Sequence, residues 1–105
     1  MSATNHEACL KACQDCAADC AACLDQCIGM AEMESCARLC RDCMLVCSTC
    51  MLLCASRSTH CASLCRACAE ICEACADECD QHDNEHCRRC AESCRRCAEA
   101  CREMA

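Results

Sequence analysis

The sequence predicts an all-α protein, an antiparallel up-down-up-down four-helix bundle with a cysteine-lined core. Cysteine supplies 23 of the 105 residues and recurs at alternating steps of three and four, which is the spacing of one face of a helix. The pattern occurs in four blocks joined by short segments, and short connections make neighbouring helices antiparallel. Proline is absent and glycine occurs once, so the blocks contain no strong helix breaker.

Each block predicts one helix. The first three blocks hold six cysteines each: Cys9, Cys13, Cys16, Cys20, Cys23 and Cys27; Cys36, Cys40, Cys43, Cys47, Cys50 and Cys54; Cys61, Cys65, Cys68, Cys72, Cys75 and Cys79. The fourth holds five: Cys87, Cys90, Cys94, Cys97 and Cys101. We expect helices over approximately residues 6–28, 35–55, 59–81 and 84–103, within one domain that spans residues 1–105.

The connecting segments carry residues that end and begin helices. Gly29 can end the first helix, because glycine adopts the left-handed conformation that follows many helices. Candidate N-caps precede the other three helices: Ser35, then Ser58 or Thr59, then Asp83 or Asn84.

The predicted core consists mainly of sulfur. The chain has no aromatic residue, and leucine, isoleucine and valine together number ten, so cysteine must provide most of the buried apolar volume. Small residues beside the cysteines let the helices approach closely. These neighbours are Ala12, Ala17, Ala62, Ala69, Ala76, Ala91, Ala98 and Ala100.

The second predicted helix carries apolar residues on its outer side as well. Leu45 and Leu52 are one heptad apart and point away from the cysteine face, where water is expected. Exposed apolar stripes usually mark protein–protein surfaces. We therefore expect self-association into a homo-oligomer through this helix.

Composition excludes several classes of function. The net charge of −7 and the lack of aromatic residues argue against nucleic-acid binding. No stretch approaches the length of apolar sequence that spans a membrane. The first residues, MSATNHEACLKAC, do not resemble a secretory signal, so we expect a cytoplasmic protein with reduced thiols. No cysteine is distinguished as an activated nucleophile, so we do not expect an enzyme.

Metal binding is the best explanation of the aligned cysteines. A purely structural role as small apolar residues does not explain 23 thiols on aligned faces. A disulfide framework conflicts with the odd number and with the expected compartment. Two sulfurs of one helix can flank a metal ion after small rotamer changes, and two-coordinate thiolate binding suits Cu(I).

Charge also favours multiple Cu(I) ions over zinc. About one Cu(I) per thiolate gives a nearly neutral core, whereas isolated sites with one zinc and four thiolates bury a net charge of about −2 each. Iron–sulfur clusters need cysteines gathered at one point, and these are spread along the helices. A zinc-binding or general soft-metal detoxifying protein stays open as the alternative.

The cysteine pattern resembles that of the bacterial copper storage proteins. Three blocks of C-x₃-C-x₂-C-x₃-C-x₂-C-x₃-C, and a fourth with Asp83 in place of its first cysteine, cover nearly the whole chain. The resemblance, closest to the cytosolic branch, implies storage or sequestration of Cu(I) inside the bundle and a homotetramer.

Antiparallel helices place the other candidate ligands at the two ends of the bundle. His6, His60 and Met104 share one end. The other end is richer in thioether, imidazole and carboxylate groups, which bind Cu(I) more weakly than thiolates and so suit an entry site. We expect entry there, through Met30, Met33, His82, Asp83 and His86.

Overall fold

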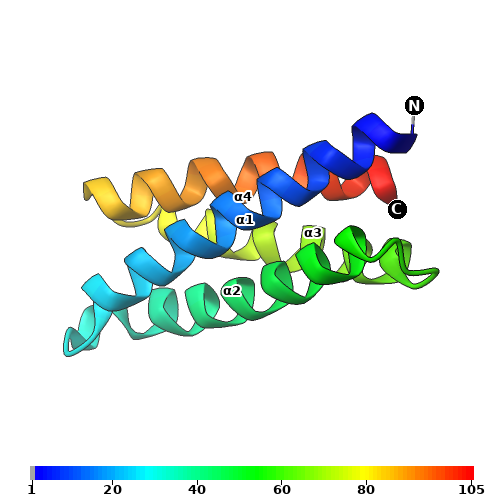
Figure 1. Cartoon of the computed structure of the whole chain (residues 1–105). Coiled ribbons are helices and arrows are strands. Elements are labelled where there is room, and N and C mark those ends of the chain that lie inside the picture. Colours follow the sequence, from blue (N-terminus) through cyan, green and yellow to red (C-terminus); the bar gives the residue numbers. More distant parts are fainter. Residues whose placement is uncertain (1) are drawn as a thin grey trace.

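In the computed structural model the chain forms four α-helices and one short 3₁₀ helix (Figure 1). The helices are α1 (Ser2–Cys27), η1 (Ala31–Met33), α2 (Glu34–Ala55), α3 (Cys61–Cys79) and α4 (Glu85–Met104). The structure describes residues 2–105, with side chains from residue 5 onward, and this range contains no strand. The predicted all-α fold is confirmed.

The four helices form an antiparallel rod of 42 × 17 × 17 Å. α1 packs against α2 and α4, and α3 packs against the same two helices. The start of α1, the end of α4 and the α2–α3 turn lie at one end of the rod, and the other two turns lie at the opposite end (Figure 1). Across the described residues, every helix is too short or too polar to cross a membrane.

We name the two ends of the rod by their turns. The α1–α2 end comprises residues 24–38 and 76–92, and it includes the α3–α4 turn. The α2–α3 end comprises residues 5–12, 50–66 and 97–105. As expected from the antiparallel order, His60 and Met104 belong to the α2–α3 end, and His82 and His86 belong to the α1–α2 end.

The observed helices begin and end within four residues of the expected bounds. α1 starts earlier than residue 6, and α3 is two residues shorter at each end than 59–81. Gly29 lies two residues beyond α1 with φ +84°, so it takes the left-handed conformation expected of it. α2 ends in a Schellman motif, in which Ser58 N–H donates to Leu53 O and Arg57 N–H donates to Cys54 O.

Only one of the predicted N-caps has the expected role. Asn84 Oδ1 accepts a hydrogen bond from Cys87 N–H at 3.0 Å. The prediction that Ser35 caps α2 was wrong. The 3₁₀ helix η1 leads directly into α2, and the backbone of η1 supplies a partner for the first N–H group of α2. Neither Ser58 nor Thr59 caps α3, whose N-cap is His60; Ser58 Oγ instead accepts from His60 N–H.

The core is built from the cysteines. All 23 are buried, with at most 4% of any residue exposed. Ala69, Ala76, Ala91 and Ala98 are also buried, and other predicted neighbours such as Ala12 pack against the cluster. The prediction of a sulfur core with alanine at the helix contacts is therefore confirmed.

One polar side chain is buried among these apolar groups. Ser93 of α4 is 1% exposed, and its hydroxyl donates a hydrogen bond to Asp19 Oδ2 of α1. Arg96 donates to the same hydroxyl oxygen at 3.2 Å. Because a buried hydroxyl without a partner costs free energy, this bond favours one register of α1 against α4. Cysteine spacing and local patterns in the sequence do not predict this pair.

Candidate metal centre

The helical repeat places cysteine sulfurs in contact along each helix. Cysteines four residues apart lie side by side, as in Cys16 and Cys20, whose Sγ atoms are 3.9 Å apart. Cys68 and Cys72 show the same arrangement at 3.8 Å. The cause is the helical geometry, because residues one turn apart project from the same face.

Contacts between helices are as short as those within them. Cys43 of α2 lies 3.4 Å from Cys72 of α3, and Cys20 of α1 lies 3.6 Å from Cys90 of α4, measured between Sγ atoms. Sequence periodicity predicts the pairs along one helix but not these contacts. They arise because alanine at the helix contacts brings the four cysteine faces together.

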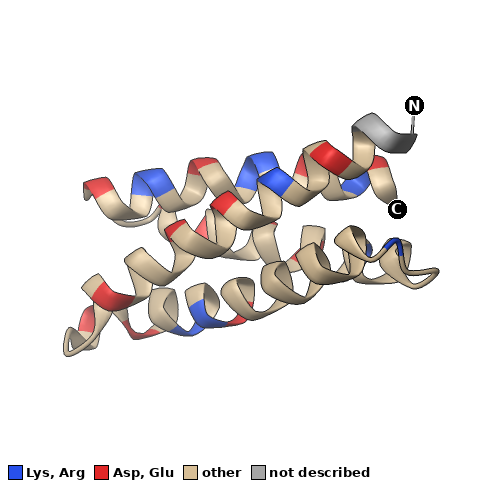
Figure 2. Cartoon of the chain, viewed as in Figure 1, with Lys and Arg blue, Asp and Glu red and all other residues tan. Residues whose placement is uncertain are grey.

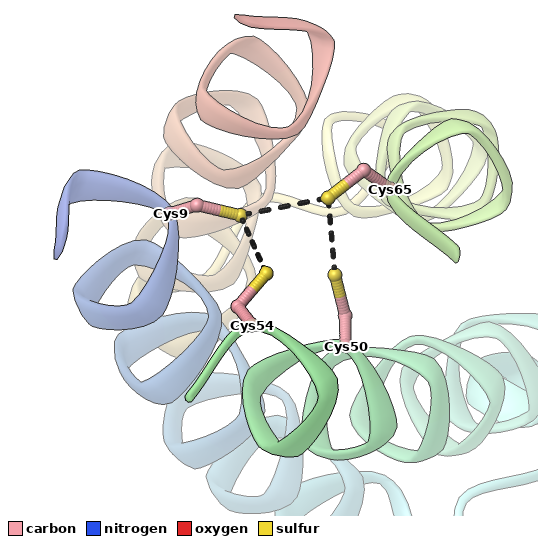
Figure 3. Close-up of side chains that lie close together, drawn as sticks. All are labelled: Cys9, Cys50, Cys54 and Cys65. Atoms are coloured by element: carbon pink, nitrogen blue, oxygen red, sulfur yellow. Dashed lines mark hydrogen bonds between the residues drawn. The ribbon is translucent and has the colours of Figure 1, made fainter. Parts of the chain in front are cut away.

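The sulfurs gather in overlapping groups of four along the axis. In each of the five groups named in this paragraph, all Sγ atoms lie within 4.8 Å of one another and come from three or four helices. Figure 3 shows a group near the α2–α3 end, in which Cys9 Sγ is 3.7 Å from Cys54 Sγ and from Cys65 Sγ. Further groups are Cys9, Cys13, Cys50 and Cys101; Cys13, Cys68, Cys97 and Cys101; Cys16, Cys47, Cys72 and Cys97; Cys16, Cys20, Cys43 and Cys94.

These distances suit thiolate coordination of a metal ion. With a metal–sulfur bond of roughly 2.3 Å, sulfurs lie about 3.8 Å apart around a tetrahedral ion and about 4.0 Å apart around a trigonal one. A linear site needs a separation of about 4.6 Å between its two sulfurs, which is slightly wider than the observed contacts. The geometry therefore accommodates low-coordinate and four-coordinate ions, and the choice of metal depends on charge.

Five thiols near the two ends of the core are protonated at neutral pH. Burial raises the pKa of Cys61 and Cys87 to about 11, and that of Cys27, Cys54 and Cys65 to about 12. The cause is desolvation, which penalises the charged thiolate. All 23 cysteines are free thiols. A metal ion that binds them must displace protons.

The α1–α2 end brings one of the five predicted entry residues against the thiols. His86 Nδ1 lies 3.2 Å from Cys23 Sγ and 3.7 Å from Cys87 Sγ. Cys23 and Cys87 belong to a sulfur group at this end that also contains Cys36 and Cys79. An imidazole in this position borders both the thiols and a surface groove between α1 and α4.

The other four predicted entry residues differ in their surroundings. Met33 is buried in the core cluster, whereas Met30 is exposed beside the α1–α2 turn. His82 Nε2 lies 2.9 Å from Glu78 Oε2. Asp83 is exposed and pairs with Arg88 at 2.9 Å. Within the described residues, the direct contact between imidazole and thiol is therefore specific to His86 at this end.

Comparison with known proteins assigns the family. The profile of the copper storage protein family matches residues 2–105. The chain belongs to the copper storage protein family. A search of curated protein sequences gave no match. The family assignment confirms the resemblance seen in the cysteine spacing.

Solved structures of copper storage proteins have the same fold. The Cu(I)-bound copper storage protein BsCsp3 has a TM-score of 0.91 and 39% identity, over 96% of this chain and 98% of the other. The protein from Streptomyces lividans loaded with 10 copper equivalents has a TM-score of 0.92 and 35% identity, over 96% of this chain and 83% of the other. A cytosolic copper storage protein from Streptomyces lividans, with five coppers, has a TM-score of 0.89 and 38% identity, over 97% of this chain and 95% of the other.

Proposed function

We propose that this copper storage protein sequesters many Cu(I) ions inside its bundle, at a ratio near one ion per cysteine, with all 23 cysteines as ligands. The observation that carries the proposal is the continuous contact among buried sulfurs from three or four helices at each level. Because the groups overlap, one thiolate can bridge neighbouring ions. Bound copper in BsCsp3 and in the protein from Streptomyces lividans supports the same chemistry here.

Charge supports copper as the cargo. Each Cu(I) ion adds one positive charge as each thiol loses one proton, so a fully loaded core stays nearly neutral. A divalent ion with four thiolates would bury about two negative charges, which costs free energy in a core without buried cations. The alternative of a zinc or general soft-metal store is therefore less favourable.

We further propose that copper enters at the α1–α2 end. This end carries nine acidic and three basic side chains, and Figure 2 shows acidic residues near the α1–α2 turn. Such a field attracts cations. His86 then offers a nitrogen ligand next to Cys23 and Cys87, from which an ion can pass inward to thiolates alone. Met30, Met33, His82 and Asp83 are proposed as weaker contributors.

We propose three further properties of the protein. The protein acts in the cytoplasm, as does the cytosolic relative from Streptomyces lividans. It binds ions without catalysing a reaction, because its thiols are uniformly buried. It assembles as a homotetramer through α2, where Leu45 and Leu52 are exposed.

An anaerobic titration of the fully reduced protein with Cu(I), against a competing chelator, tests the proposal. We expect tight uptake of more than about ten ions per chain, as bridged thiolates permit. A parallel titration with zinc is the control and should saturate near one ion per four cysteines. Saturation with copper at one or two ions would contradict a storage function.

A further inference from the structure

The α2–α3 end holds the least buried thiols of the core. Cys61 is 4% exposed and Cys54 is 3% exposed, whereas every other cysteine is at most 2% exposed. Their Sγ atoms are 2.7 Å apart, and both contact the rest of the core through Cys9 and Cys65. An ion bound by Cys54 and Cys61 would therefore be the ion most accessible to a ligand from solution.

The same turn carries an uncompensated positive charge. Arg57 follows Cys54 by three residues and is exposed. The chain has ten lysine and arginine residues, all with described side chains, and Arg57 is the one that makes neither an ion pair nor a side-chain hydrogen bond within residues 5–105. Its φ of 55° is a conformation that usually requires glycine, so a residue without a Cβ would be less strained there.

The two ends of the bundle differ in electrostatic character. The α2–α3 end has four basic and three acidic side chains, against three basic and nine acidic at the α1–α2 end. Figure 2 shows the basic colour on the α2–α3 turn. A cation is thus drawn to the α1–α2 end, whereas an anion is repelled there and meets less repulsion at the α2–α3 end.

We propose that the α2–α3 end is a release port, where a small anionic thiol withdraws Cu(I) from Cys54 and Cys61 and Arg57 attracts it. The inference rests on the proposed storage of copper. A small thiol is required because only a few per cent of either cysteine is exposed, which excludes contact with a folded protein surface. Arg57 supplies the charge that favours an anionic thiol over a cationic one.

The step is a ligand exchange without electron transfer. The sulfur of the incoming thiol forms a bond to Cu(I), and the bond from Cu(I) to the sulfur of Cys54 or Cys61 breaks. The proton of the incoming thiol passes to the departing cysteine sulfur, so copper stays in the +1 state and both charge and atoms balance.

The test compares release of copper to two small thiols of opposite charge, the anion glutathione and the cation cysteamine. The full chain is loaded with Cu(I) under anaerobic conditions, and the protein-bound copper is followed after rapid desalting. We expect Arg57→Glu to slow release to glutathione by about threefold to tenfold at low ionic strength and to speed release to cysteamine. The difference in release rate between Arg57→Glu and the parent protein should vanish in about 1 M salt.

Three controls separate the port from the store. Arg57→Lys keeps the charge and should release copper like the parent protein, and Arg38→Glu makes the same charge change at the α1–α2 end and should leave release to glutathione unchanged. The total copper capacity of every variant should equal that of the parent. Equal release rates for Arg57→Glu and the parent, or slower release in Arg38→Glu alone, would overturn the port while leaving storage intact. A parent protein that takes up one or two ions would overturn both.

Discussion

Burial raises the pKa of five thiols near the ends of the core above that of free cysteine. Cys61 and Cys87 have pKa values of about 11, and Cys27, Cys54 and Cys65 have values of about 12, against an ordinary value of 9.0. Below the ordinary value, these thiols are neutral in both the folded and the unfolded chain. Above it, the unfolded chain ionises first, so the free energy of unfolding falls as the pH rises.

We therefore expect the metal-free bundle to lose stability between about pH 9 and about pH 12, the range between the ordinary and the raised pKa values. Urea unfolding under reducing conditions, followed by circular dichroism from about pH 8 to about pH 11, measures this. The double variant Cys54→Ala/Cys61→Ala has two fewer such thiols and should show a shallower decline. A stability that rises over this range would contradict the assignment of neutral, buried thiols.

Arg57 has a backbone conformation with a measurable effect on stability. It occupies the left-handed position of the Schellman motif that ends α2, with φ 55°. We expect Arg57→Gly to raise the free energy of unfolding by up to about 1 kcal/mol, since the strain at a non-glycine residue outweighs the extra backbone entropy of glycine. Thermal unfolding should show a Tm a few degrees higher. Arg57→Ala removes the same charge but keeps the strain, so it should give no gain.

At the scale of the helix, α2 is distinctive because the outer face of its second half lacks charge. Residues 43–56 contain no charged side chain, and Leu45 and Leu52 are 57% and 63% exposed. Val46 and Met51 point partly inward and pack against the core. The exposed leucines are thus surplus to the packing of one chain, and a second copy of the protein is the proposed partner for them.

Leu45→Lys/Leu52→Lys should convert the proposed tetramer into smaller species, because charges on this face oppose burial against another chain. Light scattering coupled to size-exclusion chromatography gives the mass, to be compared with 11.4 kDa for one chain. Ile28→Lys is the matched control, since Ile28 is an equally exposed apolar residue, at 70%, outside α2. A mass unaffected by the leucine changes would place the interface elsewhere.

At the scale of the whole molecule, the core combines two roles, packing and ligation, in the same atoms. The cysteines supply nearly all the buried apolar volume, so each substitution affects stability as well as capacity. The sulfurs of Cys47 and Cys50 contact α3 at 3.7 and 3.4 Å in the middle and outer parts of the core. Alanine at both positions keeps helix propensity while removing two ligands.

Cys47→Ala/Cys50→Ala should lower the copper capacity by about two ions and leave the helical circular dichroism largely intact, at a cost of about 1–2 kcal/mol in the free energy of unfolding. Copper titration and far-ultraviolet spectra measure the two effects. Ser48→Ala/Thr49→Ala changes the two intervening residues on the outside of the same helix and should keep full capacity. An unchanged capacity in the cysteine variant would rule out an internal store that uses every thiol.

The sequence by itself determined the helices, their number and the face that each one buries. The alternating steps between Cys40, Cys43, Cys47, Cys50 and Cys54 leave no other regular structure in which all five share a face. Asn84 and Gly29 have side-chain and backbone preferences that act over a few residues, so their roles were also predictable. The N-cap predicted at Ser35 was wrong because the sequence carries only a weak local signal for the 3₁₀ helix that precedes α2.

Only the tertiary structure decided which sulfurs meet across the bundle. Cys16, Cys47, Cys72 and Cys97 form one group because of the relative heights of four helices, and those heights depend on turn geometry and on contacts such as Ser93 with Asp19. The same packing selects His86 over His82 as the imidazole against the thiols. Local periodicity fixes the direction in which a side chain points along its own helix, but contacts between helices depend on the sum of many long-range distances, which no single stretch of sequence specifies.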